Sequence, residues 1–252
     1  MSSKSVTLEY HRGTIVIKGL DSLPYSTIDS RTNSLYSFGK YYKKITEYLE
    51  EKNIKYEDRV LDLLPLGHLP KIKVELRDYQ KEAIEHWRKQ KTGTIVLPTG
   101  AGKTIVGLKI IEIVNSPTLI VVPTLDLVKQ WTKILSQSFN IEIGNIGGGT
   151  ENIQAITVST YDSAYIKAQS IGNKFLLIVF DEVHHLPAPS YRLIAETFVA
   201  PYRLGLTATI EREDHLEEDF PNLIGKSTFR ISADELAKNN YLANYTIERK
   251  QT

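Results

Sequence analysis

Apolar and polar positions follow a regular pattern along the chain from about Thr94 onward. Short runs of apolar, β-branched residues are followed by turn residues and then by longer segments in which apolar residues recur three and four positions apart. The first pattern is typical of buried strands and the second of amphipathic helices. Strands are therefore predicted at 94–97, 119–122, 155–159, 175–180 and 202–206.

Helical spacing predicts helices between these strands, including 103–114 and 125–139. The second of these helices carries an apolar face made of Leu127, Val128, Trp131, Ile134 and Leu135. Strands that are apolar on both sides and alternate with helices predict a parallel sheet with helices on both faces. The fold class expected for this part of the chain is therefore α/β.

The N-terminal part of the chain follows a different pattern. Two short apolar runs, 6–10 and 14–17, flank a turn that contains a glycine, and they predict a pair of strands. A helix is predicted at 39–51, and a loop rich in Pro and Gly then ends the segment. We therefore expect a small α+β domain at 1–70, followed by the α/β domain at 71–252.

Composition limits the class of protein. Among 252 residues, 41% are hydrophobic and 24% charged, which excludes a wholly disordered, collagen-like or membrane-spanning chain. The formal net charge is +1, so contact with nucleic acid has to come from a local basic patch. Cysteine is absent, which excludes disulfides and Cys-ligated zinc. Because no secretory signal is present, we expect an intracellular protein, cytoplasmic in a prokaryote, with no membrane partner.

A glycine-rich turn joins the first predicted strand of the larger domain to its helix. Glycines let backbone N–H groups surround a phosphate, and a helix N-terminus adds partial positive charge. The residues predicted to bind ATP here are Pro98, Thr99, Gly100, Ala101, Gly102, Lys103 and Thr104. Lys103 would reach the terminal phosphates and Thr104 would bind Mg²⁺. The first position of the general phosphate-loop pattern is occupied by Leu97, so an ordinary glycine-rich turn remains the alternative.

An acidic motif, Asp181-Glu182-Val183-His184-His185, follows the strand predicted at 175–180. In a parallel sheet this places Asp181 at the carboxyl edge, beside the phosphate loop. Asp181 would hold Mg²⁺ and Glu182 would activate water, so Lys103, Asp181 and Glu182 are the predicted catalytic group. Two acids after a strand can also simply cap the next helix. A metal centre that includes both histidines is disfavoured, because neighbouring residues are expected to point in different directions.

With these two motifs the chain resembles superfamily-two helicases, and specifically the XPB family of repair and transcription translocases. Arg77 and Gln80 match the family's Q motif, which implies that Gln80 hydrogen-bonds the adenine edge and that Arg77 packs near the base. Motif III is matched by Thr207, Ala208 and Thr209. The resemblance implies that these residues, with His184, couple hydrolysis to movement.

The same resemblance implies residues that contact DNA. Pro123 and Thr124 match motif Ia and Thr160 matches motif Ib. The triplet Arg212, Glu213 and Asp214 resembles the RED loop, proposed to help separate the duplex, although a charged surface turn is the alternative. The glycine run 147–149 is either a DNA contact or a flexible turn. The basic, aromatic cluster Lys40, Tyr41, Tyr42, Lys43 and Lys44 either binds DNA or forms a helix whose tyrosines pack in the small domain's core.

The family implies a RecA-like, ATP- and Mg²⁺-dependent 3′-to-5′ DNA helicase or translocase that acts in nucleotide excision repair or promoter opening. Implied partners are single-stranded or forked DNA, a second RecA-like lobe, and a nuclease or a transcription or repair complex. The arginine motif of that second lobe is absent from the sequence. We therefore expect the N-terminal half of such a protein, with little ATPase activity alone, because a missing arginine finger costs ~10³ to 10⁵ in rate elsewhere.

Two other functions remain open. The motor lobe of a restriction-type DNA translocase shares the Q, I, II and III pattern. A module that binds DNA or a protein partner and carries an incomplete nucleotide site is the third possibility.

Overall fold

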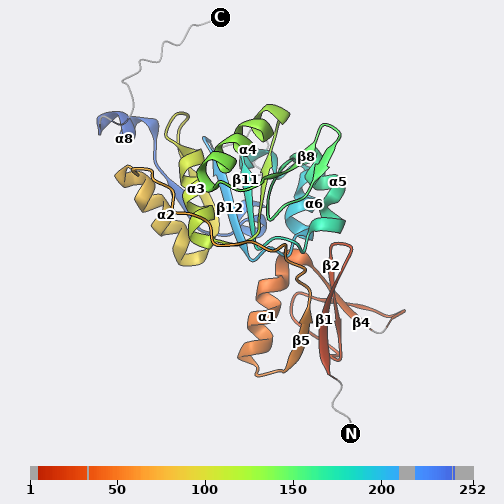
Figure 1. Cartoon of the computed structure of the whole chain (residues 1–252). Coiled ribbons are helices and arrows are strands. Elements are labelled where there is room, and N and C mark those ends of the chain that lie inside the picture. The colour runs from red at the N-terminus through yellow and green to blue at the C-terminus, as the bar shows by residue number, and fades with distance from the viewer. Residues whose placement is uncertain (1–4, 33, 210–218, 240, 242–252) are drawn as a thin grey trace, which may run out of the picture.

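The computed structural model describes residues 5–32, 34–209, 219–239 and 241. They form two sheets (Figure 1). The smaller sheet has one hydrophobic core and the larger has two. The first is a five-stranded sheet in the order β3-β4-β2-β1-β5, and the second is an eight-stranded sheet in the order β13-β6-β12-β11-β7-β10-β8-β9. The division into domains at residue 70 stays a prediction, although the two sheets lie on either side of it.

The small sheet packs against one helix. Its strands are β1 (Val6–His11), β2 (Thr14–Lys18), β3 (Thr27–Asp29), β4 (Ser34–Phe38) and β5 (Tyr56–Arg59), and a 3₁₀ turn (Gly39–Tyr41) leads into helix α1 (Tyr42–Glu51). Alternate residues such as Leu8 and Ile15 pack with Ile45 and Leu49 of α1. The predicted strand pair and helix are confirmed.

The larger sheet contains all five predicted strands. Its members are β6 (Thr92–Val96), β7 (Thr118–Val122), β8 (Gly144–Gly147), β9 (Thr150–Asn152), β10 (Ile156–Thr160), β11 (Leu177–Asp181), β12 (Tyr202–Thr207) and β13 (Thr228–Arg230). Neighbouring strands are parallel except for β8 and β9. The predicted parallel sheet is confirmed, with one antiparallel pair at its edge, where the glycine run 147–149 turns the chain back on itself.

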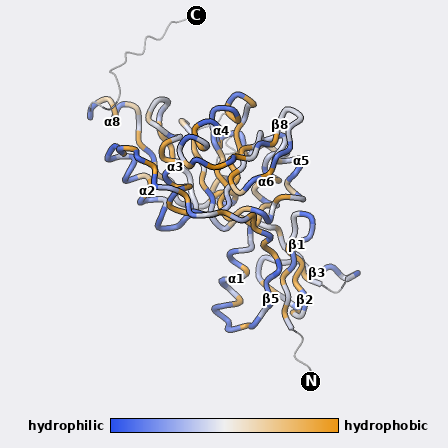
Figure 2. Tube along the Cα trace, viewed as in Figure 1, coloured by the Kyte–Doolittle hydropathy of each residue, from blue (hydrophilic) through white to orange (hydrophobic). Residues whose placement is uncertain are grey.

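Helices cover both faces of the larger sheet, as predicted. They are α2 (Asp78–Gln90), α3 (Lys103–Val114), α4 (Leu125–Phe139), α5 (Tyr161–Ile171), α6 (Pro189–Thr197), α7 (Phe220–Leu223) and α8 (Ala233–Lys238). Helices α2, α3 and α4 share one core and α5 and α6 share the other. Figure 2 shows the apolar residues gathered between these layers. None of the described helices is long and apolar enough to cross a membrane.

The small sheet packs directly against the larger domain. A Cβ atom on Gly39 would lie 2.1 Å from the carbonyl oxygen of Thr197, so glycine is required for this approach. The Tyr10 hydroxyl donates to the carbonyl of Ala168 at 3.2 Å. Val199, which comes just after α6, is buried in the core of the small domain. The two parts of the structure therefore share packing as well as polar contacts.

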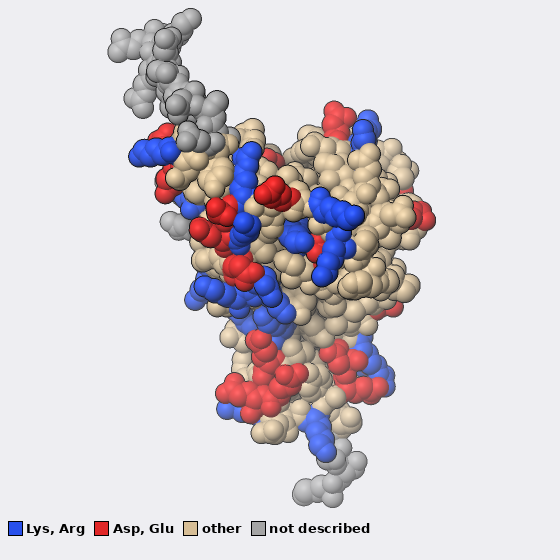
Figure 3. All heavy atoms as spheres, turned by 60° about the vertical axis from the view of Figure 1, so that its left-hand side comes forward, with Lys and Arg blue, Asp and Glu red and all other residues tan. Residues whose placement is uncertain are grey.

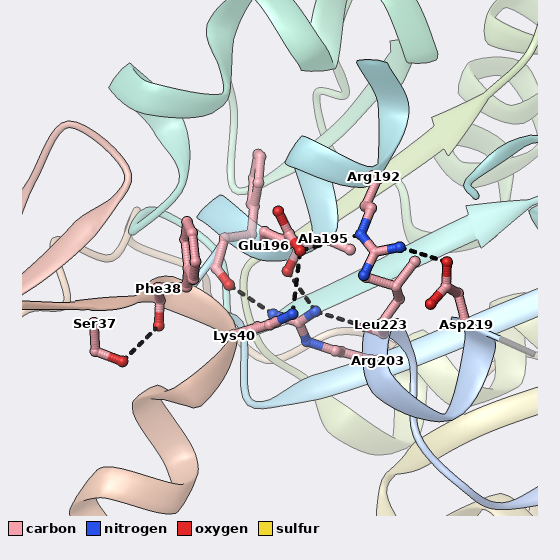
Figure 4. Close-up of polar contacts among 10 residues, drawn as sticks. Ser37, Phe38, Lys40, Arg192, Ala195, Glu196, Arg203, Asp219 and Leu223 are labelled. Carbon is pink, nitrogen blue, oxygen red and sulfur yellow. Dashed lines mark hydrogen bonds and ion pairs between the residues drawn. The ribbon is translucent and has the colours of Figure 1, made fainter. Parts of the chain in front are cut away.

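Charged side chains link the same surfaces (Figure 4). The Lys40 ammonium lies 3.2 Å from Glu196 of α6, and Arg192 lies 3.2 Å from the same carboxylate. Arg192 also pairs with Asp219, next to α7. One carboxylate therefore joins the small domain to α6, and Arg192 extends the network to α7.

Arg203 lies next to this network and hydrogen-bonds to several segments of the chain (Figure 4). It is buried at the start of β12, and burial lowers its pKa to about 10, so it stays protonated at neutral pH. Its guanidinium donates to four carbonyl groups, those of Ala195, Phe198, Ala200 and Leu223, at 2.6 to 3.1 Å. A planar group with several donors suits this arrangement, which ties α6, α7 and the loop before β12 together.

We predict that Arg203→Lys lowers the free energy of unfolding by about 2–4 kcal/mol, because one ammonium cannot reach all four carbonyls and buried acceptors would lose their partners. Urea denaturation followed by circular dichroism measures the change. The control is Arg31→Lys, at a side chain that is 89% exposed. Equal stability of the two variants would contradict the structural role of Arg203.

Candidate functional site

The glycine-rich turn lies between β6 and α3. Gly100 and Gly102 have φ angles of +79° and +80°, in the left-handed region that glycine adopts without strain. Thr99 and Gly100 are exposed, whereas Ala101 is buried. The tip of the turn is therefore open to a ligand while its base is anchored, and Lys103 is the first residue of α3. Pro98 and Thr104 are half-buried at either end.

Lys103 meets the acidic motif, as predicted. Its ammonium donates to the carbonyl of Leu97 at 3.4 Å and lies 4.0 Å from the Glu182 carboxylate. Only 13% of the Lys103 side chain is exposed. The lysine and the acidic pair are far apart in sequence, but they follow parallel strands whose carboxyl ends share one edge of the sheet.

Asp181 ends β11 and is buried. One carboxylate oxygen accepts a hydrogen bond from the indole N–H of Trp131 at 2.8 Å, and the other accepts from the backbone N–H of Glu182 at 3.1 Å. Burial raises the pKa of Asp181, and the Trp131 hydrogen bond opposes that rise. A cation beside this carboxylate would stabilise its ionised form.

Glu182 has a left-handed backbone, with φ at +48° and ψ at +54°, which costs on the order of 1 kcal/mol for a residue with a Cβ. Its carboxylate lies between Lys103, at 4.0 Å, and the Nδ1 atom of His184, at 3.5 Å. Glu182 precedes the 3₁₀ turn Val183–His185, but its side chain makes no capping hydrogen bond there. The alternative that the acids merely cap a helix therefore does not hold for Glu182.

Polar contacts continue from the acidic motif to β12. The Nδ1 atom of His184 lies 3.1 Å from the Thr207 hydroxyl. That hydroxyl donates to the carbonyl of Thr209 at 2.7 Å. Ala208 lies between the two threonines and is half-buried. Thr207 and Thr209, which are predicted to couple hydrolysis to movement, are thus connected to Glu182 through the imidazole of His184.

The two histidines do not point apart. The ring centroids of His184 and His185 are 4.3 Å apart with an interplanar angle of 38°. The prediction of divergent side chains is wrong, because in the 3₁₀ turn 183–185 the two imidazole rings pack against each other. Within the residues that the structure describes, no group of three His, Cys, Asp or Glu side chains could hold a metal ion by itself.

Gln80 is hydrogen-bonded to the glycine-rich turn. Its side chain is buried, its amide nitrogen donates to the carbonyl of Ala101 at 3.0 Å, and its amide oxygen accepts from the backbone N–H of Arg77 at 3.0 Å. The exposed Arg77 side chain donates to the Tyr79 hydroxyl and to the carbonyl of Tyr241. Contact between Gln80 and adenine, which the family resemblance implies, stays a prediction, and the amide retains one further donor and one further acceptor for it.

Thr124 and Thr160 follow neighbouring strands, β7 and β10, at the same edge of the sheet. Each caps a helix: the Thr124 hydroxyl accepts from the backbone N–H of Leu127 at 3.3 Å, and that of Thr160 from Ser163 at 3.2 Å. Pro123, just before Thr124, is half-buried. The predicted DNA contacts Arg212, Glu213 and Asp214 lie outside the described residues.

A groove of about 580 Å³ runs between α4 and the β8–β9 hairpin. It is lined by apolar Leu125 and Val128, and by Lys129 and Lys133 together with the start of the glycine run. A Cβ on Gly148 would lie 3.2 Å from Leu125, so glycine lets the hairpin approach α4. The sequence indicates the glycine run as a candidate DNA contact. It does not indicate the two lysines, because they match the polar, solvent-facing side of a helix.

The basic, aromatic cluster of the small domain is mostly structural. The buried Tyr42 donates its hydroxyl to Asp58 at 2.6 Å, and Lys40 is engaged by Glu196. Lys44 lies 5.0 Å above the ring of Tyr25 and faces a cleft of about 780 Å³ that Lys226 also lines. Figure 3 shows a group of Lys and Arg side chains where the small domain meets the larger one.

Comparison with known families agrees with this geometry. The family model described as "Type III restriction enzyme, res subunit" matches residues 73–212, and the model described as "Xeroderma pigmentosum group B helicase damage recognition domain" matches residues 8–60. The chain belongs to the res-subunit family and to the XPB family. The first match covers the phosphate loop and the acidic motif, and the second covers the small sheet.

Individual relatives match over only part of their own length. "DNA 3'-5' translocase XPB2" of Sulfurisphaera tokodaii is 51% identical over 82% of this chain and 47% of its own length. "General transcription and DNA repair factor IIH helicase/translocase subunit XPB/SSL2" of Saccharomyces cerevisiae is 28% identical over 81% of this chain and 26% of its own length. The chain thus spans about half the length of the first relative and about a quarter of the second.

Among solved structures, the UvsW helicase of bacteriophage T4 aligns with 89% of this chain and 99% of its own, with a TM-score of 0.56 and 15% sequence identity. This similarity supports the fold alone. The fold is RecA-like, as predicted, with a small domain ahead of the larger sheet.

We predict that Asp181→Asn raises the melting temperature by a few degrees at neutral pH without divalent cations. The folded-state pKa of Asp181 is raised by burial, so stability falls as pH rises through that pKa and the buried group ionises. Asn keeps an acceptor for Trp131 and carries no charge, and the predicted gain is net of the hydrogen bond from the Glu182 N–H, which its amide nitrogen cannot accept. The gain should shrink at acidic pH, where the wild-type carboxyl is protonated.

Scanning calorimetry across pH tests this, with the exposed Asp21→Asn as control. A lower melting temperature for Asp181→Asn at neutral pH would contradict the cost assigned to the buried charge.

Proposed function

We propose that the site binds ATP with Mg²⁺ and that the protein is an ATP-driven 3′-to-5′ DNA translocase or helicase of the XPB type. The observation that supports this most is the meeting of Lys103 with Glu182 and Asp181 beside an open, glycine-rich turn. An ordinary turn between a strand and a helix has no need of a buried carboxylate and a largely buried lysine at the same place.

The donor groups suit Mg²⁺. A hydroxyl from Thr104 and a carboxylate from Asp181 are hard oxygen ligands, which Mg²⁺ prefers. When bound, Mg²⁺ would neutralise charge on the phosphates. Lys103 would leave Glu182 for a terminal phosphate, and Glu182 would then be free to orient a water molecule and accept its proton. His184, Thr207 and Thr209 would sense that change through the contacts that join them to Glu182.

DNA would cross the same edge of the sheet. The backbone amides at Thr124 and Thr160 and the ammonium groups of Lys129 and Lys133 supply donors for phosphates, which is how sequence-independent translocases hold a strand. Adenine binding by Gln80 and Arg77, and strand separation by the triplet at 212–214, belong to this proposal as family-based expectations.

The name of the yeast relative, which includes transcription and DNA repair, extends the proposal to these processes. Promoter opening, forked DNA and an intracellular location belong to the proposal as family-based expectations. A second RecA-like lobe and a transcription or repair complex are the expected protein partners, the latter because the yeast relative is a subunit of factor IIH. Low ATPase activity of this chain alone stays a prediction. The match of residues 8–60 to the XPB damage recognition model favours this proposal over a restriction-type motor.

We predict that Lys103→Ala weakens binding of ATP in the presence of Mg²⁺ by about 10- to 100-fold, the range expected for loss of a charge-assisted hydrogen bond. Isothermal titration calorimetry measures the affinity. Lys109→Ala is the matched control, because Lys109 lies on the same helix and pairs with Glu112. Unchanged affinity for Lys103→Ala would remove the phosphate-loop assignment.

We also predict that replacing Lys129 and Lys133 together by Ala weakens binding of single-stranded DNA, and that the slope of log affinity against log salt falls by about 1.4, since each phosphate contact contributes ~0.7. Fluorescence anisotropy of a labelled oligonucleotide at several salt concentrations gives both values. The exposed pair Lys89→Ala and Lys238→Ala is the control. If both double variants keep the wild-type slope, the groove is not a DNA contact.

A further inference from the structure

The indole of Trp131 contacts two parts of the candidate nucleotide site, the strand that ends in Asp181 and the helix that begins at Lys103. Its N–H donates to the Asp181 carboxylate at 2.8 Å, and the side chain is only 1% exposed. Its ring lies against α3 at Gly107, where an added Cβ would come within 2.9 Å of the ring. Gly107 is about one helical turn after Lys103. Trp131 is therefore wedged between the helix that carries the lysine and the strand that carries the aspartate.

The carboxylate is held from several directions, yet it keeps capacity for a metal ion. One oxygen accepts from Trp131 and the other from the backbone N–H of Glu182. The Tyr161 hydroxyl donates to the backbone carbonyl of Asp181 at 3.1 Å, which fixes the main chain from α5. An ionised carboxylate has about four lone-pair positions, so these two hydrogen bonds orient it without filling it.

A carboxylate partner is not a general need of buried tryptophans in this chain. The only other tryptophan, Trp87, is equally buried, and its indole N–H donates to the backbone carbonyl of Arg203 at 2.9 Å. A buried indole N–H requires some acceptor, and a backbone carbonyl satisfies it. In Trp131 the acceptor is instead the side chain expected to hold Mg²⁺.

We propose that Trp131 is a positioning residue for the metal–nucleotide site. It holds the Asp181 carboxylate in the orientation that Mg²⁺ requires and ties that orientation to α4, the helix that begins after Thr124. A shift of α4 on DNA binding would then move the metal ligand directly. This inference rests on the proposed function, because it assumes that the site takes a nucleotide with Mg²⁺.

The test uses the whole chain, with ADP binding measured by calorimetry at a series of MgCl₂ concentrations and in EDTA. We expect Trp131→Phe to raise the Mg²⁺ concentration for half-maximal effect by about 10- to 100-fold, the range typical for loss of a partner of a metal ligand. Its affinity for ADP in EDTA should stay at the wild-type value, because Lys103 and the turn are untouched. Trp87→Phe should match wild type in both conditions.

An unchanged Mg²⁺ midpoint for Trp131→Phe, or an equal shift in both variants, would overturn the inference. Absence of any Mg²⁺-dependent ADP binding by the wild-type chain would instead contradict the proposed function, so the two failures are distinguishable.

A measurement on the wild-type chain avoids dependence on the folding of Trp131→Phe. Two tryptophans give two indole N–H signals in a ¹⁵N-resolved spectrum, and Trp87→Phe assigns them. We expect ADP with Mg²⁺ to shift the Trp131 signal and ADP in EDTA to leave it nearly in place, while the Trp87 signal stays fixed in both. A Trp131 signal that responds equally with and without Mg²⁺, or not at all, would overturn the inference.

Discussion

A carboxylate buried at the end of a strand costs free energy unless hydrogen-bond donors and positive charge surround it, and the structure around Asp181 offsets part of that cost. Trp131 and the backbone of Glu182 supply the donors. Lys103 supplies positive charge, although it lies closer to Glu182 than to Asp181 and pairs with that neighbour. Bound Mg²⁺ would supply the remaining positive charge beside the Asp181 carboxylate. Binding of a ligand therefore best explains why a carboxylate that destabilises the fold lies at this position.

The parallel sheet makes this arrangement possible. The turn after β6, the acids after β11 and the threonines after β7, β10 and β12 all lie at the carboxyl edge. The small domain packs at the opposite edge, where Lys40 and Tyr41 line a pocket with Thr92 and Ala200. Close packing at Gly39 and the network of Lys40, Glu196 and Arg192 connect it to the larger domain. Within the described residues, the nucleotide site and the small domain therefore lie at opposite edges of the sheet.

The local spacing of apolar and polar residues, together with the short motifs, was enough to predict much of the fold and the outline of the site. The helices at 103–114 and 125–139 have the predicted bounds, because their apolar spacing and their caps lie within the segment itself. Strand β4 was missed because Tyr36 and Phe38 are exposed while Ser37 is buried, the reverse of the usual polarity. Strand β8 was missed because two of its four residues are glycine, and β9 because it is short and polar.

What escaped prediction in the site depends on contacts between distant segments. Trp131 belongs to an apolar face of α4, so the pattern assigns it to the core, and nothing local indicates that its N–H reaches Asp181. The adenine contact of Gln80 stays a family-based prediction, and the hydrogen bond of its amide to the phosphate loop was not predicted. The four carbonyls around Arg203 converge only once α6, α7 and β12 are in place.

A crystal structure of the chain with ADP and Mg²⁺ tests the central claim most directly. We expect the terminal phosphate of ADP against the turn at 98–103 with Lys103 in contact, and Mg²⁺ beside Thr104 and Asp181. ADP bound away from this turn, or bound there with Mg²⁺ held by neither Thr104 nor Asp181, would contradict it.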